Sequence, residues 1–197
     1  GAKNSVLPIL AACVLCDSPV HLKRVPRLSD TGVSLRILDS LGCTSAFSGS
    51  EAVVDASGFY ETRIPDRLVR EMRSSVIFLG SVAARAGEAS LCLPGGCELG
   101  ARPVDLHLMG LRALGMDIRE RGEKLYATHQ GLRGAEIRLP FPSVGATENI
   151  LLAAVCAEGK TVLRGAAREP EIVDLCLFLR QCGANIVGEG SPTIYIE

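Results

Sequence analysis

Three apolar segments of the chain each end in a glycine, and they follow one another at nearly regular intervals. The segments read LRILDSLG, LMGLRALG and LCLFLRQCG, and they close at Gly42, Gly115 and Gly183, roughly 70 residues apart. Apolar residues at helical spacing followed by glycine are typical of a helix that ends in a left-handed C-cap. The pattern therefore predicts three equivalent helices within an internal repeat.

The sequence on either side of these helices repeats as well. A short strand is predicted before each one, in VHLKRV, ASLCLP and KTVLRG, and an apolar helix before that strand, in SVLPILAACVLC, SSVIFLGSVAARAG and TENILLAAVCAEG. Two strand-like pieces follow each glycine, and the last two copies add a leading strand, YETRI and AEIRL. The chain is thus predicted to be one α/β domain of three β-α-β-α-β-β units, at about 1–57, 58–134 and 135–197. The first unit lacks its leading strand.

Composition excludes some classes of protein. The chain is 47% hydrophobic with 4% aromatic residues and no Trp, which predicts an aliphatic core. A formal net charge of −1 argues against a nucleic-acid-binding surface. The apolar stretch 6–16 follows Lys3 as in a signal peptide, but similar stretches recur later and favour a core helix. None reaches the ~18 apolar residues of a membrane span.

The eight cysteines do not form a recognisable disulfide or zinc pattern. Five lie in apolar segments and are predicted to be reduced core residues: Cys13, Cys16, Cys156, Cys176 and Cys182. The first two have CxxC spacing, but no second pair or His cluster completes a zinc site. We therefore expect a cytoplasmic protein without a metal or other cofactor.

Polar or small residues begin the first helix of each unit, in GAKNS, REMRSS and PSVGAT. Helix N-termini have unpaired N–H groups and attract anions. Packing of the three units around one another would gather these ends, together with Lys3 and Arg73, into an anion site. The alternative is that Ser5, Ser74 and Thr147 are ordinary N-caps on a solvated surface.

The stretch LPGGCELGARPVD places Cys97 among Gly95, Gly96 and Gly100, with Arg102 five residues further on. The glycines predict a mobile loop able to close on a ligand. Nearby positive charge would lower the pKa of Cys97, which could then act as a nucleophile or proton donor. The loop offers no His partner, because His107 falls on the following helix, where a surface or packing role is favoured.

Four motifs together resemble one family, the UDP-N-acetylglucosamine enolpyruvyl transferases: GAKN, LPGGCELGARPVDLH, SVGATENILLAA and AAREPEIVDL. The resemblance implies two similar domains, each an inside-out α/β barrel of three such units, with substrates bound between them. It implies transfer of the enolpyruvyl group of phosphoenolpyruvate to the 3-hydroxyl of UDP-N-acetylglucosamine with release of phosphate. This is the first committed step of peptidoglycan synthesis. The chain resembles the loop-bearing domain alone.

The resemblance also implies roles for individual residues. Cys97 would be the general acid that protonates the methylene carbon of phosphoenolpyruvate, the site of a covalent adduct with that substrate, and the target of fosfomycin. Lys3 and Asn4 would lie at the substrates, with Lys3 on the phosphate of phosphoenolpyruvate. Arg102 would bind phosphoenolpyruvate, and Arg73 would add positive charge nearby. The run Arg102, Pro103, Val104, Asp105 and Leu106 would hold the uridine, and Ser143, Val144 and Gly145 would offer the helix end to the diphosphate.

Two features depart from the family pattern. Phe141 stands where some relatives have a lysine, which puts a diphosphate contact from that side chain in doubt. The family's general base, an aspartate, and a further phosphate-binding arginine belong to the second domain, which this chain does not contain. That missing domain and the two substrates are the expected partners, with no nucleic acid or membrane.

Other functions stay open at this point. One alternative is a non-catalytic module that binds a sugar nucleotide, which would not need a reactive thiol. Another is a different enzyme built from the same units, such as an enolpyruvylshikimate phosphate synthase or an RNA terminal phosphate cyclase. The first of these relatives does not carry the cysteine loop in this form. The second would need a catalytic histidine and a basic face, and neither is evident.

Overall fold

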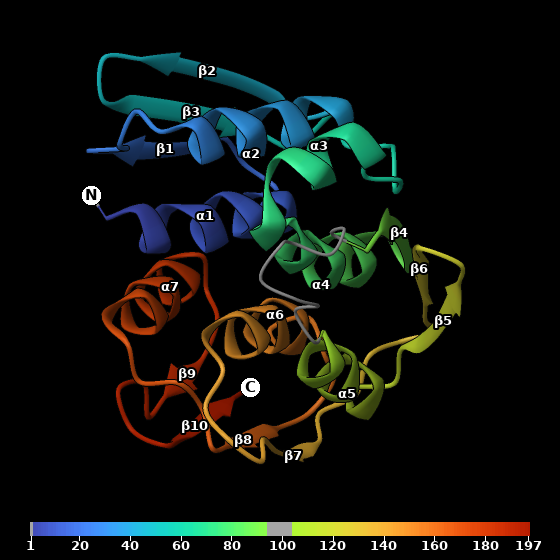
Figure 1. Cartoon of the computed structure of the whole chain (residues 1–197). Coiled ribbons are helices and arrows are strands. Elements are labelled where there is room, and N and C mark those ends of the chain that lie inside the picture. Colours follow the sequence, from blue (N-terminus) through green and yellow to red (C-terminus); the bar gives the residue numbers. More distant parts are fainter. Residues whose placement is uncertain (1, 94–103) are drawn as a thin grey trace.

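Helices fill the centre of the molecule and three sheets lie around its outside (Figure 1). The structure, a computed structural model, describes residues 2–93 and 104–197. The longer helices are α1 (Lys3–Ala12), α2 (Ser29–Ser40), α4 (Ile77–Ala86), α5 (Asp105–Ala113), α6 (Val144–Ala154) and α7 (Pro170–Gln181). Shorter ones are α3 (Asp66–Glu71) and the 3-10 helices η1 (Cys13–Leu15) and η2 (Arg73–Val76).

The three sheets share one arrangement of strands. They contain β1 (Val20–Lys23), β2 (Thr44–Ser48) and β3 (Glu51–Asp55); β4 (Glu88–Cys92), β5 (Asp117–Arg121) and β6 (Lys124–Thr128); and β7 (Glu136–Arg138), β8 (Thr161–Arg164), β9 (Ile186–Val187) and β10 (Thr193–Ile196). Their orders are β1-β3-β2, β4-β6-β5 and β7-β8-β10-β9. All named pairs are antiparallel except β7 with β8. The predicted inside-out α/β arrangement of repeated units is confirmed.

Glycine ends the second helix of each unit, as predicted. Gly42, Gly115 and Gly183 have φ of +92°, +101° and +104°. The N–H of each donates to a carbonyl three residues earlier, at 2.9–3.1 Å. A side chain is strained in this left-handed conformation, so glycine turns the chain from the helix towards the next strand.

The predicted leading strand YETRI is wrong as a full strand. It is reduced to an isolated parallel bridge between Arg63 and Ser90, beside β4. The N–H of Ile64 donates to Ser90 O at 2.9 Å, and Pro65 then follows, which has no N–H to continue a ladder. The next residues form α3, which the sequence reading missed although Leu68, Val69 and Met72 are spaced for one buried helix face.

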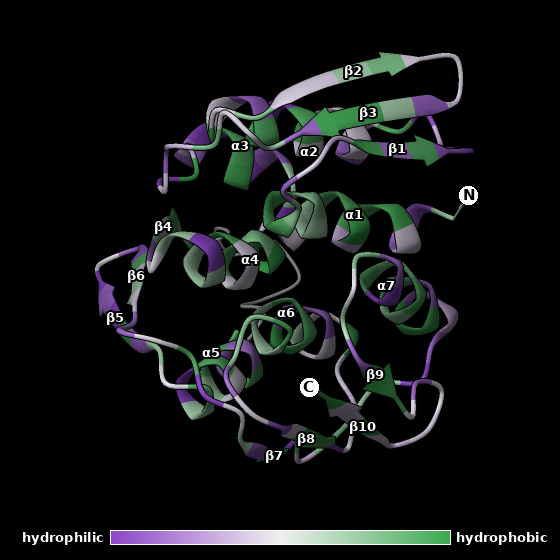
Figure 2. Ribbon diagram, turned by 180° about the vertical axis from the view of Figure 1, so that it is seen from behind, coloured by the Kyte–Doolittle hydropathy of each residue, from purple (hydrophilic) through white to green (hydrophobic). Residues whose placement is uncertain are grey.

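The central helices α1, α4 and α6 bury nearly all of their surface. Every residue of α6 from Ala146 to Ala154 is buried, and so is every residue of α4 from Ile77 to Ala83. The apolar colouring of these segments in Figure 2 reflects the same pattern. The apolar helix predicted in TENILLAAVCAEG is shorter than its apolar run, because α6 ends at Ala154 and Cys156 is exposed. No helix among the described residues is long and apolar enough to cross a membrane.

The prediction that five cysteines are core residues is partly wrong. Cys13 and Cys176 are buried, Cys16 is half-buried, and Cys156 and Cys182 are exposed. The two exposed ones follow the ends of α6 and α7, where the chain emerges from the core. All the cysteines that the structure describes are free thiols.

Gly80 lets α4 and α6 pack at close range, which provides a test of the fold. A Cβ added at Gly80 would lie 2.7 Å from the backbone oxygen of Asn149. Because a backbone atom cannot move aside, we expect Gly80→Ala to lower the free energy of unfolding by about 2–3 kcal/mol, measured by urea denaturation.

The matched control is Gly32→Ala on α2, where an added Cβ meets nothing within 4 Å. It should leave stability unchanged or raise it by about 0.5 kcal/mol, since alanine is the better helix former. Equal stability of the two variants would contradict the close packing of α4 on α6.

Candidate functional site

The first helices of the three units begin around one pocket. The pocket has a volume of about 320 Å³ and is lined by residues from the starts of α1, η2 with α4, α5, α6 and α7: Asn4, Leu7, Pro8, Arg73, Ser74, Val76, Ile77, Val104, His107, Val144, Gly145, Glu148 and Glu171. Helix starts with their N–H groups therefore converge on this space, as expected from the repeat.

The serines and threonine of the three helix starts are not N-caps, so that alternative is wrong. The helices begin earlier, with Ala2, Met72 and Ser143 at the N-cap positions. The Ser5 hydroxyl instead donates to Asp174 Oδ2 at 2.5 Å, which ties α1 to α7. The Thr147 hydroxyl accepts the N–H of Ala167 at 3.1 Å, which ties α6 to the chain after β8.

Lys3 and Asn4 lie on the same turn but have different neighbours. Lys3 Nζ forms an ion pair with Asp30 Oδ2 of α2 at 2.6 Å and does not line the pocket. Asn4 lines it, and its Nδ2 donates to Glu171 Oε1 at 3.2 Å. Of the two residues predicted for this position, the structure places Asn4 at the pocket and Lys3 beside it.

The start of α6 is shaped for close approach. Ser143 is its N-cap, and its hydroxyl accepts the N–H of Ala146 at 3.4 Å. Val144 and Gly145 line the pocket. A Cβ at Gly145 would lie 3.0 Å from Cε1 and 3.2 Å from Nε2 of His107, so glycine leaves room for the imidazole against the helix.

His107 lines the pocket, whereas the sequence favoured a surface or packing role for it. The Asn149 amide nitrogen can only donate, so His107 Nδ1, 3.1 Å away, accepts. The ring proton is therefore on Nε2. Burial lowers the pKa of His107 to about 4, so the ring is neutral at neutral pH. The pocket thus has a neutral imidazole with one N–H donor.

Asn149 holds three elements together beneath the pocket. Its Oδ1 accepts the N–H of Gly80 at 2.8 Å, and its Nδ2 donates to Val76 O at 2.9 Å and to His107 Nδ1. The side chain is fully buried. It joins α6 to the junction of η2 with α4 and to α5, which fixes three walls of the pocket relative to one another.

Glu148 is a second pocket residue that the sequence reading passed over. The side chain is buried, with 6% of the residue exposed, and no hydrogen bond or ion pair joins it to the residues that the structure describes. Burial, and then the charge of Glu171, raise the pKa of Glu148 to about 8. It is therefore a protonated acid at neutral pH. A charged residue inside the apolar run TENILLAA was the available signal.

The remaining predicted residues lie around this pocket or outside the described chain. Arg73 and Val104 line it, Asp105 is exposed at the start of α5, and Leu106 is half-buried against the core. Cys97, Arg102 and Pro103, with the whole predicted lid, lie outside the described residues. Phe141 is 58% exposed, two residues before the N-cap of α6.

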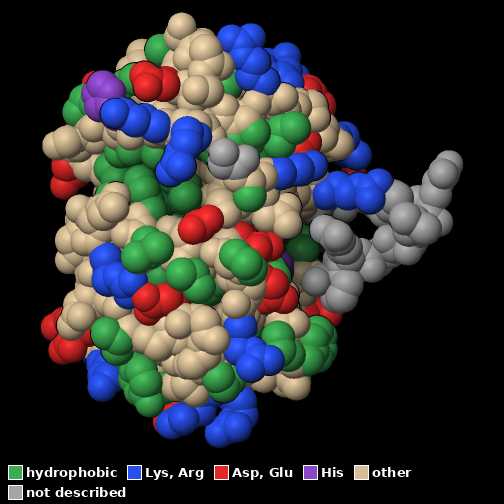
Figure 3. All heavy atoms as spheres, turned by 90° about the vertical axis from the view of Figure 1, so that its left-hand side faces the viewer, with side chains coloured by type: hydrophobic (Ala, Val, Ile, Leu, Met, Phe, Trp, Pro, Cys, Tyr) green, Lys and Arg blue, Asp and Glu red, His purple; other side chains and the backbone are tan. Residues whose placement is uncertain are grey.

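The face seen in Figure 3 carries Lys and Arg side chains mixed with carboxylates rather than one positive patch. The pocket likewise combines Arg73 with two glutamates. Its capacity for anions therefore depends on helix N–H groups and neutral donors as well as on cationic side chains.

Comparison with known proteins agrees with this architecture. The fold and the pocket of converging helix starts define one lobe of an enolpyruvyl-transferase-type α/β protein. Over residues 1–197 the chain matches the family described as EPSP synthase (3-phosphoshikimate 1-carboxyvinyltransferase), and it belongs to that family.

The chain is also similar to curated relatives within this family. The chain is 50% identical over 197 residues to UDP-N-acetylglucosamine 1-carboxyvinyltransferase 2 of Caldanaerobacter subterraneus subsp. tengcongensis, and 46% identical over 198 residues to the enzyme of Finegoldia magna named UDP-N-acetylglucosamine 1-carboxyvinyltransferase. All of this chain aligns with 47% of each relative, so it spans about half their length. The resemblance stated from the sequence motifs is confirmed.

Solved structures give the same fold. The enolpyruvyl transferase NikO from Streptomyces tendae matches with a TM-score of 0.88 at 25% identity, covering 100% of this chain and 46% of that one. EPSP synthase from Acinetobacter baumannii matches with a TM-score of 0.72 at 19% identity, covering 100% of this chain and 45% of that one. The second likeness concerns the fold alone.

The role of Asn149 can be tested by removing its amide. Asn149→Ala leaves the buried Gly80 N–H and Val76 carbonyl without this partner, so we expect the free energy of unfolding to fall by about 2–4 kcal/mol in urea denaturation. The control is Asn185→Ala, away from the buried core, which should change it by less than about 0.5 kcal/mol. A cost for Asn149→Ala no greater than the control's would contradict the bridging role.

Proposed function

We propose that these 197 residues form one domain, the loop-bearing lobe, of a UDP-N-acetylglucosamine 1-carboxyvinyltransferase that works in the cytoplasm. The observation that carries the proposal is the convergence of the three helix starts and Arg73 on one pocket. Family membership and the relatives' names support it, as does the sequence match of the cysteine loop. The division at about 57/58 and 134/135 into three repeats is part of the proposal.

Both substrates of this reaction are phosphorylated, and the pocket suits them. Under the proposal Arg73 and the N–H groups at the starts of α1 and η2 receive phosphoenolpyruvate, with Lys3 added from the rim. The motif match assigns Arg102 to the same substrate. Lys3 would then exchange Asp30 for the substrate phosphate. This exchange is inexpensive, because the Lys3 side chain is half-exposed and such surface ion pairs contribute only about 0–1 kcal/mol.

The sugar nucleotide takes the neighbouring side of the pocket. Ser143, Val144 and Gly145 present the start of α6 to the diphosphate, and the run Arg102, Pro103, Val104, Asp105 and Leu106 holds the uridine. His107 Nε2–H and the protonated Glu148 donate hydrogen bonds to the same ligand. Neutral donors suit this position because a second full negative charge beside Glu171 would repel a polyanion.

Cys97 carries the acid step in this proposal. As the 3-hydroxyl of the sugar attacks C2 of phosphoenolpyruvate, the thiol gives its proton to the methylene carbon C3. A tetrahedral intermediate results. Return of a proton from C3 to the Cys97 thiolate and loss of phosphate from C2 then restore the double bond and leave the enolpyruvyl ether. The base that takes the hydroxyl proton is assigned to the part of the protein outside this chain.

One lobe should therefore bind the substrates without catalysing the reaction. It lacks the proposed base, and it leaves both substrates solvated on one side, where charge interactions are screened. We expect no steady phosphate release from the chain alone with both substrates, and release once the missing lobe is added in trans. Cys97→Ser should lower the reconstituted rate at least about 100-fold.

Steady turnover by the lone chain that Cys97→Ser abolishes would show that the base lies within these residues. Reconstituted turnover that is unchanged by Cys97→Ser would remove the thiol from the proton transfer. Either result would contradict the division of roles proposed here.

Binding of UDP-N-acetylglucosamine should weaken as Glu148 ionises. With a pKa of about 8, the ionised fraction rises steeply between pH 6.5 and 8.5, whereas the diphosphate keeps its charge. For the unsubstituted chain we expect the Kd of UDP-N-acetylglucosamine, measured by an NMR titration, to rise about fourfold over this range. Glu148→Gln cannot ionise and should show a flat profile.

The matched control is Glu158→Gln, an exposed glutamate just beyond the end of α6. It should keep the fourfold change. If Glu148→Gln and Glu158→Gln give the same pH profile, Glu148 does not act on the ligand. If no variant binds the nucleotide at either pH, the sugar-nucleotide site itself is wrong.

A further inference from the structure

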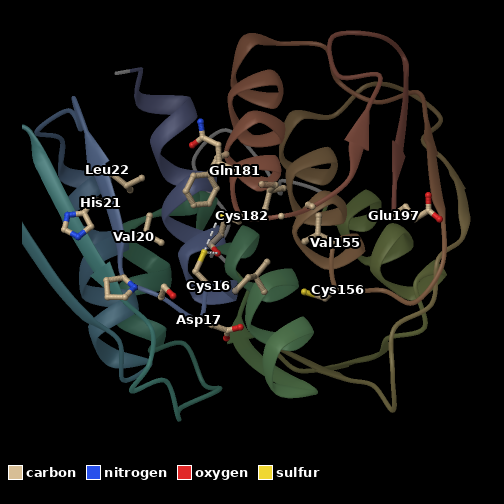
Figure 4. Close-up of a pocket in the computed structure, with 18 residues that line it drawn as sticks. Cys16, Asp17, Val20, His21, Leu22, Val155, Cys156, Gln181, Cys182 and Glu197 are labelled. Atoms are coloured by element: carbon tan, nitrogen blue, oxygen red, sulfur yellow. Dashed lines mark hydrogen bonds between the residues drawn. The ribbon is translucent and has the colours of Figure 1, made fainter.

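A second hollow lies where the first unit of the chain meets the third. It has a volume of about 720 Å³ and is lined by residues of η1, β1 and the ends of α6 and α7. Three of the lining residues are cysteines, Cys16, Cys156 and Cys182 (Figure 4). The function proposed above uses none of them.

Two of these thiols face each other. Cys16 Sγ and Cys182 Sγ are 3.7 Å apart, although 166 residues separate them in the chain. The CxxC neighbour of Cys16 has another partner, since Cys13 is buried and its thiol donates to Ile9 O at 3.3 Å. The two cysteines of the CxxC spacing therefore do not pair with each other, and the close pair in space joins the residues that follow η1 and α7.

The backbone on both sides of this pair is held in place. Arg85 donates to Cys16 O at 3.0 Å and to Ala56 O at 3.2 Å, and its guanidinium stacks on Phe59. Cys182 follows the last turn of α7, and its N–H donates to Phe178 O at 3.1 Å. Closure of the sulfur–sulfur gap therefore requires movement of two short side chains rather than of either helix.

We propose that Cys16 and Cys182 are a site of oxidative modification that closes to an intramolecular disulfide, with small-molecule disulfides as the oxidant. The exposed Cys182 reacts first. Its thiolate attacks the oxidant's disulfide, forms a mixed disulfide and releases one molecule of small thiol. The Cys16 sulfur then loses its proton, attacks the Cys182 sulfur and releases the second small thiol. Two protein thiols are oxidised and one disulfide is reduced to two thiols.

The environment of Cys16 fits the second step. Burial, and then the neighbouring Cys182, raise the pKa of Cys16 to about 12. The oxidant in solution therefore reacts mostly with the exposed thiol of Cys182. Cys16 then reacts with the Cys182 sulfur, which already lies beside it. The order of the steps follows from exposure and distance.

The bond would fasten the ends of two helices that also meet at the substrate pocket. α1 and α7 pack against each other with their starts together and their ends together, since Asn4 contacts Glu171 near their starts and Cys16 contacts Cys182 just beyond their ends. A disulfide here fixes the first unit to the third at the end opposite the pocket. The disulfide also closes a loop that spans the 166 residues between the two cysteines, and a cross-link over so long a loop strongly lowers the entropy of the unfolded chain.

The test uses the chain with Cys97→Ala throughout, so that the proposed catalytic thiol does not react. The protein is incubated with oxidised glutathione, and its disulfides are mapped by peptide mass spectrometry without reduction. We expect one linked peptide pair, Cys16 with Cys182, and a melting temperature about 5–10 °C higher that reverts on adding a reducing thiol.

Three further variants make the outcome specific. Cys16→Ser should stop at glutathione bound to Cys182, Cys182→Ser should form no link, and Cys156→Ser should behave like the parent. The proposal is overturned if the parent itself stops at the mixed disulfide, if Cys156 is the linked partner, or if the thiols stay free. Since the linkage is measured in the parent protein, the test does not depend on whether the variants fold.

Discussion

The buried amide of Asn149 is the contact on which the geometry of the pocket depends. One side chain of α6 bonds to Gly80 N–H, Val76 O and His107 Nδ1, so it fixes α4 and α5 against α6 in a single arrangement. Gly80 allows the backbones to come close enough for these bonds. An unpaired amide in this core would cost more than its bonds contribute, which disfavours any packing of the three helices that leaves it without these partners.

The same packing explains why an anion pocket can form with few cations. Helix starts that converge on one space bring several unpaired N–H groups to it, and burial keeps His107 and Glu148 neutral. Lys3, the cation at the start of α1, is paired with Asp30. The pocket is therefore polar and weakly charged on its own. A polyanion would gain most from it when further positive groups and the exclusion of water are supplied from outside this lobe.

Much of the fold was predictable because it is encoded locally. Apolar spacing and a closing glycine are short-range signals, and their threefold recurrence gave the order of the elements. Two predicted elements were too long. Pro65 ends the strand predicted in YETRI after a single bridge, and α6 ends at Ala154, before its apolar run does. The site was only half predictable. Asn4, Arg73 and Gly145 stand at helix starts, whereas the pKa shifts of Glu148 and His107 arise from burial against neighbours far away in the sequence.

The α1–α7 pair shows most clearly what sequence spacing cannot give. Cys13 and Cys16 are close in the chain, yet the 3-10 turn that ends α1 directs Cys16 towards Cys182 instead. Ser5 with Asp174 and Asn4 with Glu171 hold the other end of the same two helices. These contacts join the first unit to the third, and α1 and α6 each pack on α4. Since the first and third units supply adjoining walls of the pocket, its shape depends on these α1–α7 contacts as much as on the core beneath it.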